Sequence, residues 1–120
     1  MNVTLSIPKT FRGAITVSED PSATNELPVI EGDHVILPIP LSGELCVKSI
    51  PFTQAEFTGY NAQWSDGTGI PDGTIQKGQA DKTYFYYMFI PKKNPRAEYF
   101  FVGTPGEKDR FLEKATWTSL

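Results

Sequence analysis

Few residues in this chain have the chemistry of a nucleophile or a general base. His34 is the single histidine, Cys46 is the single cysteine, and Asp33 directly precedes the histidine. A Ser-His-Asp or Cys-His arrangement would have to use His34, with Asp33 or Cys46 as its partner. Neither pair has a spacing typical of a catalytic site. We therefore predict no catalytic residue, an inert thiol, and a protein that is not an enzyme.

The stretch from Asp66 to Gly73 is a candidate for metal or phosphate binding, because it combines aspartates with glycines. It lacks the alternating carboxylates and the terminal glutamate that complete an EF-hand. It also lacks the Gly-Lys-Ser/Thr sequence and the following helix of a phosphate loop. Asp-Gly pairs are common in ordinary turns. We predict no metal site and no cofactor.

Three aromatic residues stand next to a polar loop, 66–81, that contains four glycines. Aromatic side chains beside such a loop are typical of a sugar-binding face or of the centre of a protein interface. The alternative is that the aromatic side chains close the open end of the core. The predicted binding residues are Phe57, Tyr60, Trp64, Asp66 and Asp72.

The longest apolar run of the sequence is Tyr84–Ile90, and the other elements must pack around it. Its alternate residues, including Phe85 and Phe89 on one side, give two apolar faces at a period of two. A strand with two apolar faces is covered on both sides, so we place it at or near the middle of a sheet. Pro91 ends the strand, since proline cannot donate to the ladder.

Other segments predict further strands and one helix. Residues 3–7, 14–18 and 44–50 alternate apolar and polar, and 27–30 with 34–37 suggest a hairpin. Thr104-Pro105-Gly106-Glu107 has the spacing of a capping box before a one-sided apolar pattern. No internal repeat is recognised. We predict a mainly β single domain, 1–120, that is a two-sheet β-sandwich or a strongly curved antiparallel sheet with one C-terminal α-helix.

Composition excludes several classes of function. The 120 residues carry a net charge of −3, and 39% of them are hydrophobic. Basic residues in the C-terminal third are interleaved with acidic ones, so we predict no nucleic-acid partner. No stretch is apolar for long enough to span a membrane. The lone cysteine fits a reducing compartment, and we expect a cytoplasmic protein if Met1 is the native start.

Three short patterns resemble a family of small bacterial β-rich domains of unknown function, many of which are exported lipoproteins. The patterns are Ile7-Pro8 with Phe11 and Gly13, the run Ile39–Leu45, and Phe101-Val102-Gly103-Thr104 before an acidic helix start. The resemblance implies a mostly β fold and no particular activity. This sequence departs from the family in having no export signal and no lipid-attachment cysteine near its start.

Two functions follow from these features. The first is a non-enzymatic protein-binding domain of the inhibitor or immunity type, with an unidentified protein partner. The alternative is a β-sandwich that binds a carbohydrate or small ligand through the aromatic and glycine-rich region 57–82. An enzyme that uses His34 is the weakest interpretation. The oligomeric state does not follow from the sequence.

Overall fold

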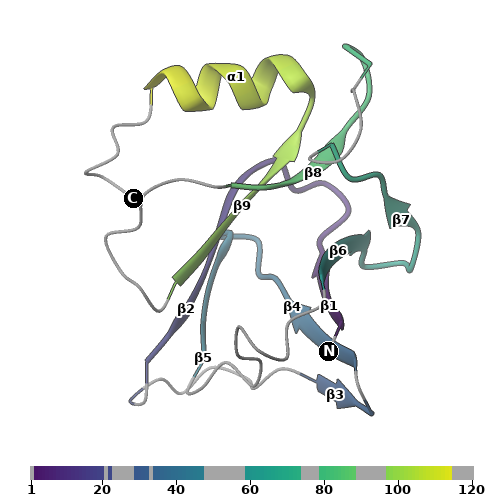
Figure 1. Ribbon diagram of the computed structural model, residues 1–120, viewed down its shortest axis with the longest axis vertical. Coiled ribbons are helices and arrows are strands. Elements are labelled where there is room, and N and C mark those ends of the chain that lie inside the picture. The colour runs from purple at the N-terminus through teal and green to yellow at the C-terminus, as the bar shows by residue number, and fades with distance from the viewer. Residues whose placement is uncertain are drawn as a thin grey trace.

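A computed structural model of the protein describes residues 2–20, 22, 29–32, 34–47, 59–73, 79–88 and 97–114. These residues form two β-sheets and one helix (Figure 1), which confirms the predicted mainly β, two-sheet class. The first sheet has the order β3 (Val29–Glu31), β4 (His34–Pro38), β1 (Asn2–Ile7), β6 (Gly59–Trp64) and β7 (Gly69–Ile70). The second sheet has the order β5 (Glu44–Val47), β2 (Gly13–Glu19), β9 (Ala97–Gly103) and β8 (Tyr84–Tyr87).

The strands pair in a mixture of directions. In the first sheet β1 is parallel to both β4 and β6, and in the second sheet β2 is parallel to β5. The other pairs of strands are antiparallel. The β1–β4 and β2–β5 pairs are parallel because β1 and β4 each leave the first sheet and continue as β2 and β5 in the second. Two such corners that lie side by side must run in the same direction.

These two corners carry a repeated pattern, which corrects the expectation that the chain has no internal repeat. Val-x-Leu-x-Ile-Pro occurs at residues 3–8 and again at 35–40, and each copy is followed by Gly-x-(Ile/Leu)-x-Val, at 13–17 and 43–47. The register pairs Val3 with Val35 and Leu5 with Leu37. The turn between the two parts of the pattern differs in length between the copies. The repeat therefore does not appear at one fixed period along the sequence.

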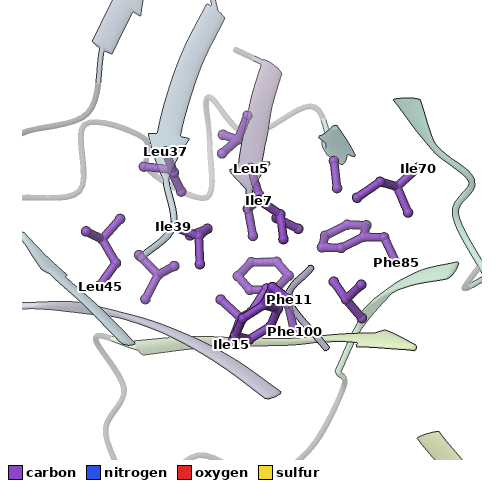
Figure 2. Packing of buried hydrophobic residues seen from close by; sticks show 14 of the residues in the cluster. Leu5, Ile7, Phe11, Ile15, Leu37, Ile39, Leu45, Ile70, Phe85 and Phe100 are labelled. Carbon is purple, nitrogen blue, oxygen red and sulfur yellow. The ribbon is translucent and has the colours of Figure 1, made fainter. Parts of the chain in front are cut away.

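The core lies between the sheets and follows from the alternation of side chains along each strand (Figure 2). Leu5 and Ile7 of β1 face Ile15 of β2 and Phe100 of β9, and all four are essentially inaccessible to solvent. Phe11, from the turn between β1 and β2, packs within the same core cluster. Burial of such side chains contributes about 1.5–3 kcal/mol each, which makes this layer the main source of stability.

The prediction that the apolar run at 84–90 is a central strand is wrong. Its described part, β8, lies at the edge of the second sheet, next to β9. Both faces of β8 are nevertheless buried: Phe85 faces the inter-sheet core, whereas Tyr84 and Tyr86 belong to a second cluster beneath the helix. The free edge is covered too, because the Phe85 N–H donates to the Pro71 carbonyl at 2.9 Å. The predicted core residue Phe89 lies outside the described residues.

Helix α1 (Pro105–Lys114) begins where the capping box predicts. The Thr104 N–H donates to Glu107 Oε1 at 2.9 Å, and the Glu107 N–H donates to Thr104 Oγ1 at 3.2 Å. The helix packs Phe111 and Leu112 onto the second sheet, on the side away from the first sheet (Figure 1). Within the described part of the chain, no helix is long and apolar enough to cross a membrane.

Candidate functional site

The turn Pro40–Gly43 connects β4 of the first sheet to β5 of the second. Leu41 at its tip is 73% exposed. Among the described residues, it is the one large apolar side chain that is exposed to solvent. The Gly43 N–H donates to the Pro40 carbonyl at 2.9 Å and closes the turn. The Ser42 hydroxyl accepts a bond from the Glu44 N–H at 3.3 Å. Leu41 is therefore held out from the domain by a closed backbone ring.

Gly43 anchors this turn to the body of the domain. Its φ of +77° lies in the left-handed region that side chains other than glycine rarely adopt. A Cβ atom there would lie 2.6 Å from the Ala14 carbonyl oxygen and 2.9 Å from the Phe11 ring. The Gly43 carbonyl also accepts a bond from the Thr16 N–H at 2.8 Å. The turn is thus fixed both by its own backbone and by close contact with the neighbouring strand.

Asp66 lies in an exposed turn after β6. Its carboxylate accepts the Lys9 ammonium at 2.5 Å and the Thr68 N–H at 2.9 Å. These hydrogen bonds hold the pKa of Asp66 well below its usual range, with the Lys9 bond the largest cause. The Trp64 N–H donates to the Thr68 carbonyl at 2.8 Å and closes the same turn. The contacts described for Asp66 are those of an Asp-Gly turn.

Tyr60 and Trp64 are half-buried and pack against the inter-sheet core. The Tyr60 ring lies 4.9 Å from the rings of both Tyr87 and Phe100, in edge-to-face contact. This is the core-closing arrangement that the sequence leaves open as the alternative. A binding role for their exposed parts stays a prediction.

Tyr87 and Glu98 form a polar pair near Tyr60. The Tyr87 hydroxyl donates to Glu98 Oε2 at 2.5 Å. Burial, and next the Glu98 carboxylate, raises the pKa of Tyr60, and burial with the Glu98 hydrogen bond raises that of Tyr87. Both phenols therefore stay protonated near neutral pH and do not act as bases.

The remaining predicted site residues are Asp72 and Phe57. Asp72 is half-buried and forms an isolated bridge with Phe85, beside the edge of β8. Gly73, the next residue, packs against the Tyr86 ring. Phe57 lies outside the described residues. Asp72 thus lies in the segment that covers β8, whereas Asp66 lies in the turn next to Lys9.

His34 has hydrogen-bonding neighbours that its sequence position does not reveal. Its Nε2 lies 2.5 Å from Thr4 Oγ1, and the Thr4 hydroxyl donates to Asn61 Oδ1, also at 2.5 Å. Because this hydroxyl has one proton and gives it to Asn61, the His34 Nε2 must carry the proton in their shared bond. The imidazole is then a donor to Thr4 and not its general base, and Thr4 itself is only 4% exposed. This geometry is not that of an activated nucleophile.

Metal-ligating side chains do not gather in the described residues. No group of three His, Cys, Asp or Glu residues in those ranges is placed to hold a metal ion. Cys46 is a half-buried free thiol on β5, paired in register with Ser18.

Sequence reasoning missed Leu41, Thr4 and Asn61. A signal for Leu41 was present, because an apolar residue between Pro40 and Ser42-Gly43 must sit at a turn position and face solvent. Thr4 and Asn61 carry no such signal, since each is an ordinary polar residue on an alternating strand.

No known family model matches the sequence, and no curated protein sequence matches it. Among solved structures, one described as a "putative lipoprotein from Bacillus anthracis" is similar to it, with a TM-score of 0.49 and 14% sequence identity. The similarity covers 92% of this chain and 74% of that one. At this identity and TM-score the likeness transfers no function.

Proposed function

We propose that this protein is a non-enzymatic protein-binding domain of the inhibitor or immunity type, and that Leu41 is central to the contact with its partner. The observation that carries the proposal is the 73% exposure of Leu41 on a closed, anchored turn. Its partner is a protein with an apolar pocket that receives one branched side chain.

The energetics of interfaces support this role. Complete burial of a leucine side chain contributes about 1.5–3 kcal/mol. A loop that is already rigid in the free protein loses little conformational entropy on binding, so more of that energy appears as affinity. The Gly43 contacts with Phe11 and Ala14 supply this rigidity.

The surroundings of the turn have the polar character of an interface rim. Pro40, Ser42 and Glu44 are exposed beside Leu41. An apolar anchor within a ring of polar groups is the usual anatomy of a protein interface.

The proposal that the domain is not an enzyme is supported by the direction of the hydrogen bonds around His34. Thr4 gives its proton to Asn61, and its oxygen is buried. A reacting carbonyl group therefore has no access to the hydroxyl nearest to the imidazole.

The test is capture of partners from extracts of the source cells by immobilised protein. Wild type and Arg110→Ser, a matched change of an exposed helix residue, should retain the same protein. Leu41→Ser should weaken that binding by about thirtyfold, as expected for loss of a central anchor. Equal retention by Leu41→Ser, or no protein retained by wild type, would contradict the proposal.

A carbohydrate or small-ligand site in region 57–82 is the second candidate. Trp64 supports it, because this ring is half-buried directly before the exposed turn 65–69. In this case a ligand would stack on the accessible part of the indole and bond to the polar turn. Binding of a sugar that perturbs Trp64 and Asp66 together would favour this candidate over the Leu41 surface.

A further inference from the structure

We propose that the outer face of the first sheet is a binding site for a neutral glycan chain. This face is the side of β4, β1 and β6 that points away from the inter-sheet core. Its described polar side chains, called the outer-face residues below, are Thr4, Ser6, His34, Asn61 and Gln63. The site uses none of the residues of the Pro40–Gly43 turn and does not rest on the function proposed for that turn.

The parallel pairing places these side chains in rows. Val3, Leu5 and Ile7 of β1 point into the core, so Thr4 and Ser6 between them point outward. The register sets Thr4 beside Asn61 and Ser6 beside Gln63 on one side, and beside the half-buried Ile36 and Pro38 of β4 on the other. With strands about 4.8 Å apart and about 6.6 Å between alternate residues, the polar groups cover an area roughly 10 Å by 7 Å.

The hydrogen bonds within the face fix the direction in which its groups bond to a ligand. Thr4 donates to Asn61 Oδ1 and accepts from His34 Nε2. In the tautomer with its proton on Nε2, the imidazole is then left with Nδ1 as an acceptor, and the Asn61 amide with two N–H donors. Thr4 is buried between them, whereas Asn61 is exposed and His34 is half-buried. The network therefore holds one acceptor and one double donor in place before a ligand arrives.

A hydroxyl-rich ligand matches this pattern. Each sugar hydroxyl both donates and accepts, so neighbouring hydroxyls can satisfy the His34 Nδ1 acceptor and the Asn61 donors together. None of the outer-face residues is an acid, a lysine or an arginine, and the acidic residue nearest to them in the register is Glu31 of β3, which pairs with His34. Nucleic acids and other polyanions require basic groups, which this face does not supply.

The arrangement of the sheets also favours a ligand on the outer face of the first sheet. Sheets of parallel strands are normally covered on both faces. Here the parallel strands β4, β1 and β6 have the core on one face, and α1 packs on the other sheet (Figure 1). A chain of sugars would cover the outward groups while replacing their bonds to water.

The test is nuclear magnetic resonance titration of the full chain with cellohexaose, maltohexaose and N-acetylchitohexaose as neutral probes. At least one should shift the backbone amides of the outer-face residues in a saturable manner. In Asn61→Asp the carboxylate still accepts the Thr4 proton but offers no N–H group. That variant should bind the same sugar about tenfold more weakly, which corresponds to ~1.4 kcal/mol. The control variant Arg110→Ser, a change of an exposed helix residue, should bind it as wild type does.

Three outcomes would overturn the inference. One is that none of the three sugars shifts the outer-face amides at millimolar concentration. Another is that Asn61→Asp, with its spectrum otherwise folded, binds as tightly as wild type. The third is that the shifts centre on Trp64 and its turn, which would assign the sugar to the opposite side of β6. Gln63→Ala provides a second variant if Asn61→Asp does not fold, and should weaken binding likewise.

Discussion

Replacement of Gly43 by alanine tests whether the Leu41 turn is packed as closely as the structure indicates. The residue combines a φ of +77° with contacts that leave no room for a Cβ atom. Gly67 provides a matched control, because its φ is +94° and nothing lies within 4 Å of the position of its Cβ. The two variants share the backbone penalty, and Gly43→Ala alone adds the steric one.

The two penalties can be estimated separately. An L-residue in the left-handed region costs roughly 1–2 kcal/mol, which is the expected effect of Gly67→Ala. Overpacking a close contact costs typically 1–3 kcal/mol more. The 2.6 Å approach to the Ala14 oxygen can be relieved only by moving backbone, since that atom belongs to β2. We therefore expect Gly43→Ala to lose about 2–5 kcal/mol, a large share of the stability of a small domain.

Urea denaturation followed by circular dichroism measures both variants. Gly43→Ala should lower the midpoint well below that of Gly67→Ala, with the same slope. If the two variants differ by less than about 0.5 kcal/mol, the turn does not pack against Phe11 and Ala14, and the argument for a rigid Leu41 anchor fails.

Three further changes test the core, the helix start and the predicted site. Phe100→Ala should cost roughly 3–5 kcal/mol, because its ring contacts three other aromatic rings at 4.9–5.5 Å; a melting temperature within a degree or two of wild type would refute this packing. The hydrogen bond from the Thr104 N–H is the main cause that lowers the pKa of Glu107 from its ordinary 4.5. The ionised Glu107 carboxylate therefore stabilises the folded protein above pH 4.5, and this stabilisation is lost as the pH falls through the lower folded-state pKa. Glu107→Gln should therefore flatten the fall in melting temperature between about pH 5 and pH 2, and an unchanged pH profile would contradict the cap geometry. Trp64→Ala should lower stability by ~2 kcal/mol, because the ring packs against the core; no loss in thermal melting would place it on the surface as a free binding group.

Local features such as a helix start or a hairpin turn can be predicted from the sequence, because residues close together in the chain determine them. The capping box from Thr104 to Glu107 predicts the helix start, since both partners lie within one turn. Glu31-Gly32 predicts the β3–β4 hairpin, where Gly32 adopts a φ of +60°. Alternation along β1 and β2 predicts which side chains enter the core.

The position of β8 shows the limit of such reasoning. Two apolar faces predict burial on both sides, and both faces are buried. The covering of one face by α1, and of the edge by the segment at Pro71, is a matter of tertiary packing. Sequence periodicity predicts which faces of a strand are buried, but not which elements cover those faces. A middle strand and a covered edge strand therefore look alike.

Tertiary structure alone decided which residues come together on the outer face of the first sheet. His34, Thr4 and Asn61 come together across gaps of 30 and 57 residues because β1 pairs in parallel with β4 and β6. Strand pairing sets such contacts, and the energies that choose between parallel and antiparallel partners are spread over whole sheets. From the sequence, the alternation of apolar and polar residues predicts only that these side chains point away from the core. Hydrogen-bonding partners, unlike burial, depend on which strand becomes the neighbour.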